Sequence, residues 1–296
     1  MSIKKKKKIP YGQILLHIIF IVTCLTYILP FVLLLSISFS NEDAIAQYGY
    51  TIFPKVFDTS AYKMIFENPG QLINSYITTI TFTAITVFLS LVFKSLLAYP
   101  LSRSTFRFKK VITIFLTITM MFGGGLIPTY IIYTKILHLG NTIWVYILPG
   151  LVSAWDIVII RTFFQGIPES LPESAKIDGA SELRIYFNIM LPLSTPVLAT
   201  IGFMTMISKW NDWNTALIYI RDSKLFSLQY MLQKILREVD FVEKMATENS
   251  QLAEYSVPKE SMRYAMAMLA AGPMLVVFPF FQKYFVKGMT VGAVKG

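Results

Sequence analysis

Residues 14–39 read ILLHIIFIVTCLTYILPFVLLLSISF, an apolar run without Asp, Glu, Lys or Arg. A helix needs about 20 such residues to cross the roughly 30 Å hydrocarbon core of a bilayer. Four further uncharged segments of similar length cover 72–93, 111–134, 185–208 and 264–282. A sixth, 139–164, carries only Asp156 and Arg161. The pattern predicts an all-α, polytopic membrane protein whose transmembrane domain, 14–284, contains six transmembrane helices.

The overall composition agrees with a protein that lies in lipid. Of the 296 residues, 54% are hydrophobic and 15% are charged, whereas soluble domains carry about a quarter charged residues. The net charge of +10 does not indicate nucleic-acid binding, because the basic residues lie in short runs between apolar segments rather than on one face. The single cysteine, Cys24, excludes an internal disulfide framework, and two histidines are too few for a metal cluster.

The basic residues orient the chain. Lysines at 4–8 precede an apolar run that is too long for a signal peptide and lacks a small-residue cleavage site, so we interpret it as a retained first helix. Residues 1–13 then form a basic cytoplasmic N-terminus. In this orientation the cytoplasmic segments hold fourteen Lys and Arg and the two short outer segments hold three, which satisfies the positive-inside rule. Both termini are therefore predicted to be cytoplasmic, including the tail 285–296.

Helix breakers occur within three of the spans. They are Pro30 in the first, the Gly run 123–125 with Pro128 in the third, and Gly272-Pro273 with Pro279 in the sixth. Membranes tolerate such residues where neighbouring helices or water-lined cavities satisfy the freed backbone groups. They fit a bundle that moves, and plain helix kinks would explain them nearly as well.

The loop 165–190 is polar, is predicted to be cytoplasmic and carries its own helix signals. Ser170 and Glu173 have capping-box spacing, Pro172 falls in the first turn, and Gly179 supplies a stop. A helix this short is marginal alone in water. We therefore expect the segment 171–178 to dock on a partner, with an ordinary solvated loop as the alternative.

Residues 173–192 resemble the E-A-A-x-x-x-G-x9-I-x-L-P signature of the membrane subunits of binding-protein-dependent ABC importers. Every fixed position matches except the second, where Ser174 replaces Ala. The resemblance implies a type I importer permease fold, in which this loop is a coupling helix that fits a cleft on the ATP-binding subunit. It implies coupling roles for Glu173, Ser174, Ala175, Lys176, Asp178 and Gly179.

Other stretches are similar to the sugar-importer branch of these permeases, and to its second, maltose-permease-like subunit. They lie at 123–128, 167–169, 176–181 and 292–296. The resemblance implies a carbohydrate substrate, an oligosaccharide above all, and a place in the bacterial cytoplasmic membrane. The implied partners are a second homologous permease, two ATP-binding subunits and an extracytoplasmic solute-binding protein. The outer loop 222–262 is expected to contact that binding protein.

The sequence contains no G-x-x-x-x-G-K-[ST] phosphate loop, so we expect the chain to bind no cofactor itself and to lack an ATPase site. ATP and Mg²⁺ would be used by the partner ATP-binding subunit. The main competing function is a stand-alone secondary transporter, but 1–140 and 141–296 show none of the internal repeat typical of such carriers. A membrane-embedded enzyme is a third option, and no convergent catalytic set supports it.

Asp156 is a candidate for the substrate path because ionisable residues inside a span are expensive to bury. It follows Leu139 by 17 residues, roughly 26 Å along a continuous helix, so we expect it near the cytoplasmic boundary. A polar contact with a neighbouring helix is the favoured role, with a gate or proton relay as alternatives.

Trp210, Asn211, Trp213 and Asn214 are the other candidates for the substrate path, and they lie near the outer end of the fifth span. Aromatic rings beside amide groups suit a saccharide, which presents apolar ring faces and hydroxyl edges. The aromatic belt at the membrane interface explains the two Trp equally well.

Overall fold

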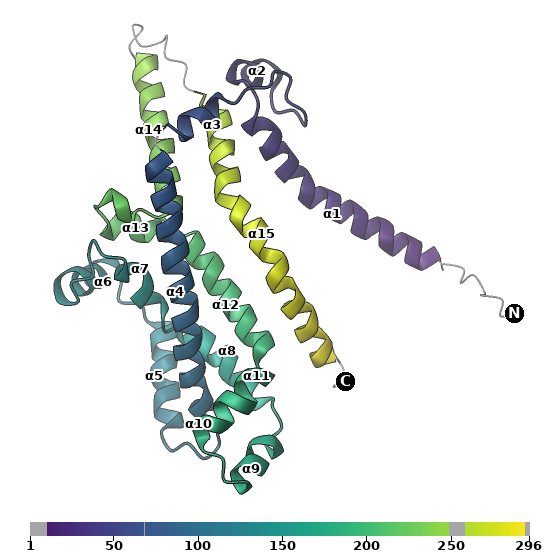
Figure 1. The fold of residues 1–296 in the computed structure, drawn as a ribbon, viewed down its shortest axis with the longest axis vertical. Helices are drawn as coiled ribbons and strands as arrows, with labels where there is room; N and C mark the ends of the chain where they lie inside the picture. The colour runs from purple at the N-terminus through teal and green to yellow at the C-terminus, as the bar shows by residue number, and fades with distance from the viewer. Residues whose placement is uncertain (1–10, 68, 249–257, 294–296) are drawn as a thin grey trace, which may run out of the picture. The chain divides into compact units, whose positions relative to one another are not determined.

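The computed structural model describes residues 11–67, 69–248 and 258–293, and its regular elements there are helices apart from one isolated bridge between Ser40 and Phe57. Figure 1 shows these helices along the chain. Three are long and apolar enough to cross a membrane, namely Gly12–Ser38, Pro69–Ser102 and Lys259–Gln282. The all-α membrane fold predicted from the sequence is confirmed.

Three further candidate spans are bent pairs of helices, which brings the total to six when each pair counts as one span. The segment Lys109–Met121 + Leu126–Ile136 bends by 113°, Trp144–Gly150 + Ala154–Gln165 by 45°, and Glu182–Leu193 + Thr195–Trp210 by 77°. The sequence predicted a crossing at each of these places, but it did not predict bends of this size.

The predicted helix breakers behave differently from one another. Pro30 lies inside an unbroken helix, and so do Pro273 and Pro279. The glycine run 123–125 does interrupt its span, and Gly125 adopts a φ of 80°, a conformation that residues with a Cβ rarely adopt. Only at this run do the predicted breakers coincide with a bent pair in the described residues.

The chain divides into two compact units, of which the first contains Met1–Glu67 and Ile235–Ala271. Its helices are α1 (Tyr11–Ser38), α2 (Glu42–Tyr48), α3 (Ser60–Ile65), and parts of α14 (Leu228–Glu248) and α15 (Lys259–Ala293). The Glu42 carboxylate accepts hydrogen bonds from the backbone N–H groups of Glu260 and Ser261, at 2.8 and 3.1 Å. It thereby satisfies free donors at the start of α15.

The second unit contains Asn68–Lys234 and Gly272–Gly296. Its helices before residue 166 are α4 (Pro69–Ser102), α5 (Lys109–Met121), α6 (Leu126–Ile131), π-helix η1 (Ile132–Ile136), α7 (Trp144–Ile147), 3₁₀-helix η2 (Leu148–Gly150) and α8 (Ala154–Gln165). Those that follow are α9 (Ser170–Ile177), α10 (Glu182–Ile185), π-helix η3 (Tyr186–Met190), α11 (Leu191–Leu193), α12 (Thr195–Trp210), α13 (Asn214–Tyr219) and 3₁₀-helix η4 (Ser223–Leu225).

Helix α4 is the central element of the second unit, because α8 and α12 both pack along it. Toward α9, Ala98 and Tyr99 of α4 share a buried apolar cluster with Ile157 and Ile160 of α8 and with Ile201 of α12. A second cluster forms around Phe82 of α4, whose ring stacks on Tyr146 of α7 with centroids 4.3 Å apart.

Two segments that the sequence analysis placed outside the spans contain helix. The predicted outer loop 222–262 contains α14, Leu228–Glu248, and the start of α15 at Lys259. The C-terminal tail 285–296 is helical as far as Ala293, because α15 continues through it. The lysines at 4–8 of the basic N-terminus lie outside the described residues.

Candidate functional site

The predicted docking helix exists as α9, between the end of α8 and the start of α10, and Figure 1 shows it at one end of the second unit. Pro172 is buried, and Ala175 packs against the apolar cluster of α4, α8 and α12, so one face of the helix rests on the bundle. The predicted capping box is wrong. Ser170 already lies inside the helix, and the N-cap residue Glu169 makes no side-chain capping bond.

The end of α9 is a Schellman motif built on Gly179. Gly179 has a φ of 78°, as its position at a helix stop predicts. The Ala180 N–H donates to the Ala175 carbonyl at 2.9 Å, and the Gly179 N–H donates to the Lys176 carbonyl at 3.0 Å. These are the two bonds that define the motif, and they fix the direction in which the chain leaves the helix.

The outward face of α9 combines polar and apolar side chains. Glu173, Ser174 and Asp178 are exposed, as expected for a contact surface. Ile177 is 87% exposed and Leu171 is 42% exposed. The sequence analysis missed these two residues because it considered only the polar and small positions. An Ile placed two residues before the Gly stop, in an otherwise polar helix, was the available signal.

Two of the predicted coupling residues have local structural roles. The Lys176 Nζ lies 2.5 Å from a carboxylate oxygen of Glu182, so this lysine links α9 to α10. The other Glu182 oxygen accepts a hydrogen bond from the Tyr99 hydroxyl of α4, which extends the link into the bundle. The Ser174 hydroxyl donates to the Leu171 carbonyl at 3.0 Å, so this replacement of Ala leaves no unpaired hydroxyl.

The second half of the sequence motif, 189–192, belongs to a packed segment that joins α10 to α12. Met190 is fully buried, and so is Tyr186, whose hydroxyl lies 2.7 Å from that of Ser95 in α4. The segment between α10 and α12 is therefore held by buried side chains and is not a free loop.

Asp156 makes the interhelical polar contact that the sequence analysis favoured. Its carboxylate lies 2.8 Å from the Nζ of Lys94, which is 2% exposed and also donates to the Thr205 hydroxyl at 3.3 Å. The ion pair joins α4 to α8, and the hydrogen bond to Thr205 links it to α12. The position of Asp156 near the cytoplasmic boundary stays a prediction; the span bends by 45° before α8. Asp156 lies in the first turn of α8, nine residues and about 14 Å from its end at Gln165.

The Trp and Asn candidates do not form one helical face, because α12 ends at Trp210 and α13 starts at Asn214. Trp210 is 5% exposed, with its ring 6.5 Å from that of Tyr76. Asn211, Trp213 and Asn214 are exposed. The Asn211 side-chain oxygen accepts a hydrogen bond from Gln229 at 3.2 Å. Of the four, Trp210 is thus the one enclosed by the bundle.

The comparison with protein families identifies the chain. The family described as "Binding-protein-dependent transport system inner membrane component" matches residues 64–291. The chain belongs to this family. As a member, it is a multi-pass membrane protein and the membrane component of a transport system.

Individual relatives agree with the family along nearly the whole chain. "Protein LplC" of Bacillus subtilis is 39% identical over 91% of this chain and 90% of that protein. The "Polygalacturonan/rhamnogalacturonan transport system permease protein YtcP" of the same organism is 37% identical, over 91% of this chain and 93% of that protein. Among solved structures, a chain of a bacterial ABC transporter involved in the import of the acidic polysaccharide alginate has a TM-score of 0.78 and 29% identity. It covers 96% of this permease and 100% of its own length.

Proposed function

We propose that this permease is half of the translocation pathway of an ATP-driven carbohydrate importer that takes up oligosaccharides. A second homologous permease supplies the other half, and an extracytoplasmic binding protein delivers the substrate. Two separate ATP-binding subunits hold ATP and Mg²⁺ and engage α9. The carbohydrate substrate is supported by two relatives, whose names refer to polygalacturonan, rhamnogalacturonan and alginate.

The observation that carries the proposal is the exposed, rigidly terminated helix α9. Its eight residues would form a marginal helix alone, and the side chain of Ile177 is exposed to 87%. A partner that covers Ile177 and Leu171 removes apolar surface from water and stabilises the helix. The link from Lys176 through Glu182 to Tyr99 gives the movement of such a partner a route into α4.

On the substrate path, we propose that Asn211, Trp213 and Asn214 contact the passing sugar, since their side chains are exposed near one end of α12 and α13. Asp156 and Trp210 support the path from within the bundle. A panel of oligogalacturonides and neutral oligosaccharides, titrated against the associated binding protein, tests the substrate class. Binding of amino acids or peptides in place of every glycan would contradict it.

Gly179→Val tests the coupling role of α9. A β-branched residue at a φ of 78° costs about 1 kcal/mol or more, while nothing lies within 4 Å of the added Cβ. The exit of the helix should be redirected without disturbing the bundle. We expect substrate uptake and recovery of the ATP-binding subunit in a pull-down to fall by tenfold or more at normal amounts of the permease in membranes.

Gly49→Val is the matched control, because Gly49 ends α2 with a φ of 70° and also has free space around its Cβ. It should leave recovery of the ATP-binding subunit unchanged.

A second pair of variants separates the effect of surface contact from that of backbone strain. Ile177→Asp should reduce the recovery, whereas Phe53→Asp, at a side chain that is 80% exposed outside α9, should not. Normal uptake by both α9 variants would overturn the proposed coupling role.

A further inference from the structure

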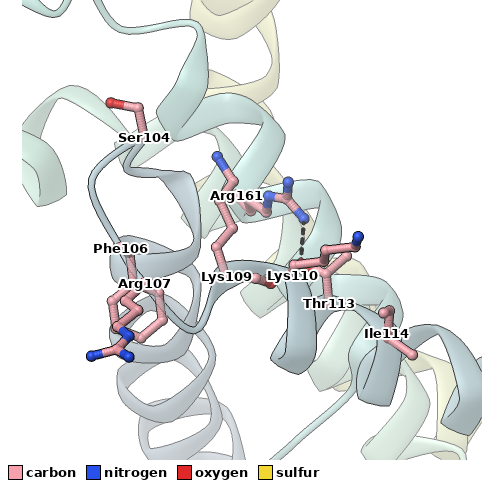
Figure 2. Close-up of a pocket in the computed structure, with 8 residues that line it drawn as sticks. All are labelled: Ser104, Phe106, Arg107, Lys109, Lys110, Thr113, Ile114 and Arg161. Carbon is pink, nitrogen blue, oxygen red and sulfur yellow. Dashed lines mark hydrogen bonds between the residues drawn. The ribbon is translucent and has the colours of Figure 1, made fainter.

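A basic pocket of about 410 Å³ lies where the turn after α4 leads into α5 (Figure 2). Eight residues line it; four are Arg or Lys and none is acidic. Three of the cations, Arg107, Lys109 and Lys110, come from the turn and the first residues of α5, and the fourth is Arg161 of α8. Figure 2 shows the Arg161 side chain reaching toward the start of α5.

The cations of this pocket are not neutralised within the part of the chain that the structure describes. None of the four forms an ion pair with a carboxylate there. One Arg161 Nη donates to the Thr113 hydroxyl at 3.1 Å, which fixes the guanidinium, while its Nε is buried without a hydrogen-bond partner. A fixed guanidinium beside two lysines is suited to binding phosphate oxygens.

The helix that leaves the pocket has an apolar outer face. Val111, Ile114, Phe115 and Ile118 are each about half exposed or more and recur at the spacing of one helical face. On the other side of α5, Ile112 and Leu116 pack against the core of the bundle. The outer face therefore provides an apolar strip that starts directly at the basic pocket.

We propose that the pocket binds the phosphate headgroup of an anionic phospholipid whose acyl chains lie along the exposed face of α5. The positive-inside distribution of charge places the turn 103–110 on the cytoplasmic side, where anionic headgroups attract basic pockets between membrane helices. An acidic soluble protein would match the charges but not the adjoining apolar strip. The site is independent of the proposed carbohydrate substrate.

Native mass spectrometry of the purified chain, equilibrated with equal amounts of phosphatidylglycerol and phosphatidylcholine in detergent, tests the proposal. The unchanged protein should retain phosphatidylglycerol preferentially. The double variant Lys109→Gln/Lys110→Gln should lower that retention by about tenfold or more. Arg161→Gln should lower it as well, and Arg161→Lys should restore part of it, because the charge returns without the planar fork.

The matched control is Lys135→Gln/Lys224→Gln, which removes two exposed lysines elsewhere in the second unit and should keep the retention unchanged. Equal loss in this control, or no preference for phosphatidylglycerol in the unchanged protein, would overturn the proposal. Inorganic phosphate that displaces the lipid would instead assign the pocket to a free anion. Pocket variants that retain the lipid but lose the ATP-binding subunit would make the pocket a protein contact.

Discussion

Helices α1 and α4 both span enough residues to cross a membrane, yet their side chains are used in opposite ways. Helix α1 is exposed on all sides along most of its length, including large apolar residues such as Phe20 and Leu25. Helix α4 buries a third of its most apolar window and encloses most of its polar residues. Those buried polar residues are Ser75, Thr78, Thr79, Thr83, Thr86, Ser90, Lys94, Ser95 and Ser102.

The difference shows how polarity is distributed in a membrane bundle. Lipid tails are as apolar as Leu, so an apolar surface gives no preference for protein over lipid. Small and polar side chains do favour contact with another helix over contact with lipid. Small side chains let two helix backbones approach closely, and polar side chains form hydrogen bonds between helices. The buried Ser and Thr residues of α4 thus mark the side that faces other helices. The mostly apolar α1 leaves its surface for lipid or for another subunit.

Asp156→Ala should give the largest effect, because it leaves the Lys94 ammonium, only 2% exposed, without its counter-ion. Breaking a buried pair from one side costs about 3 kcal/mol or more. The free energy of unfolding, measured by titration with SDS in mixed micelles, should fall by that amount. The double variant Lys94→Met/Asp156→Leu should recover most of the loss. If Asp156→Ala were as stable as the unchanged protein, the ion pair would not contribute to the stability of the bundle around α4.

Gly202→Val tests how closely α12 approaches α4. A Cβ at Gly202 would lie 3.1 Å from Leu91 Cδ1, so a larger side chain overpacks this contact. We expect a loss of about 1–3 kcal/mol in the same titration. Gly12→Val in α1 is the control, since nothing lies within 4 Å of the corresponding Cβ. Equal losses of stability in both variants would contradict the conclusion that α12 packs closely on α4 while α1 is exposed.

Thr79→Val should have the smallest effect. The Thr79 hydroxyl is fully buried and accepts the Leu228 N–H at 2.8 Å, so its removal leaves that donor unpaired. The expected cost is about 1–2 kcal/mol. Thr23→Val in α1, whose exposed hydroxyl only bonds back to Ile19, should cost almost nothing. Hydrogen exchange at the Leu228 amide would show whether the loss is local.

Several features were visible in the sequence without being recognised. In α14, the buried residues Leu228, Met231, Leu232 and Val239 follow helical spacing. The sequence analysis described this segment only as part of the outer loop 222–262. Lys94 lies one residue past the end of a span that was defined by the absence of charge, so its pairing with Asp156 was not considered. At Lys94 a charged residue was read as the end of a span, although it lies inside α4.

The sequence by itself determined where the chain can cross a membrane, because length and apolar composition alone satisfy that requirement. It also determined helix α9 and its stop, since Gly179 must adopt a backbone conformation that other residues avoid. Only the tertiary structure decided the bends of three spans, the pairing of Lys94 with Asp156 and the meeting of Arg161 with the start of α5. These features depend on residues that are far apart in the chain, and no local pattern specifies which of them will meet.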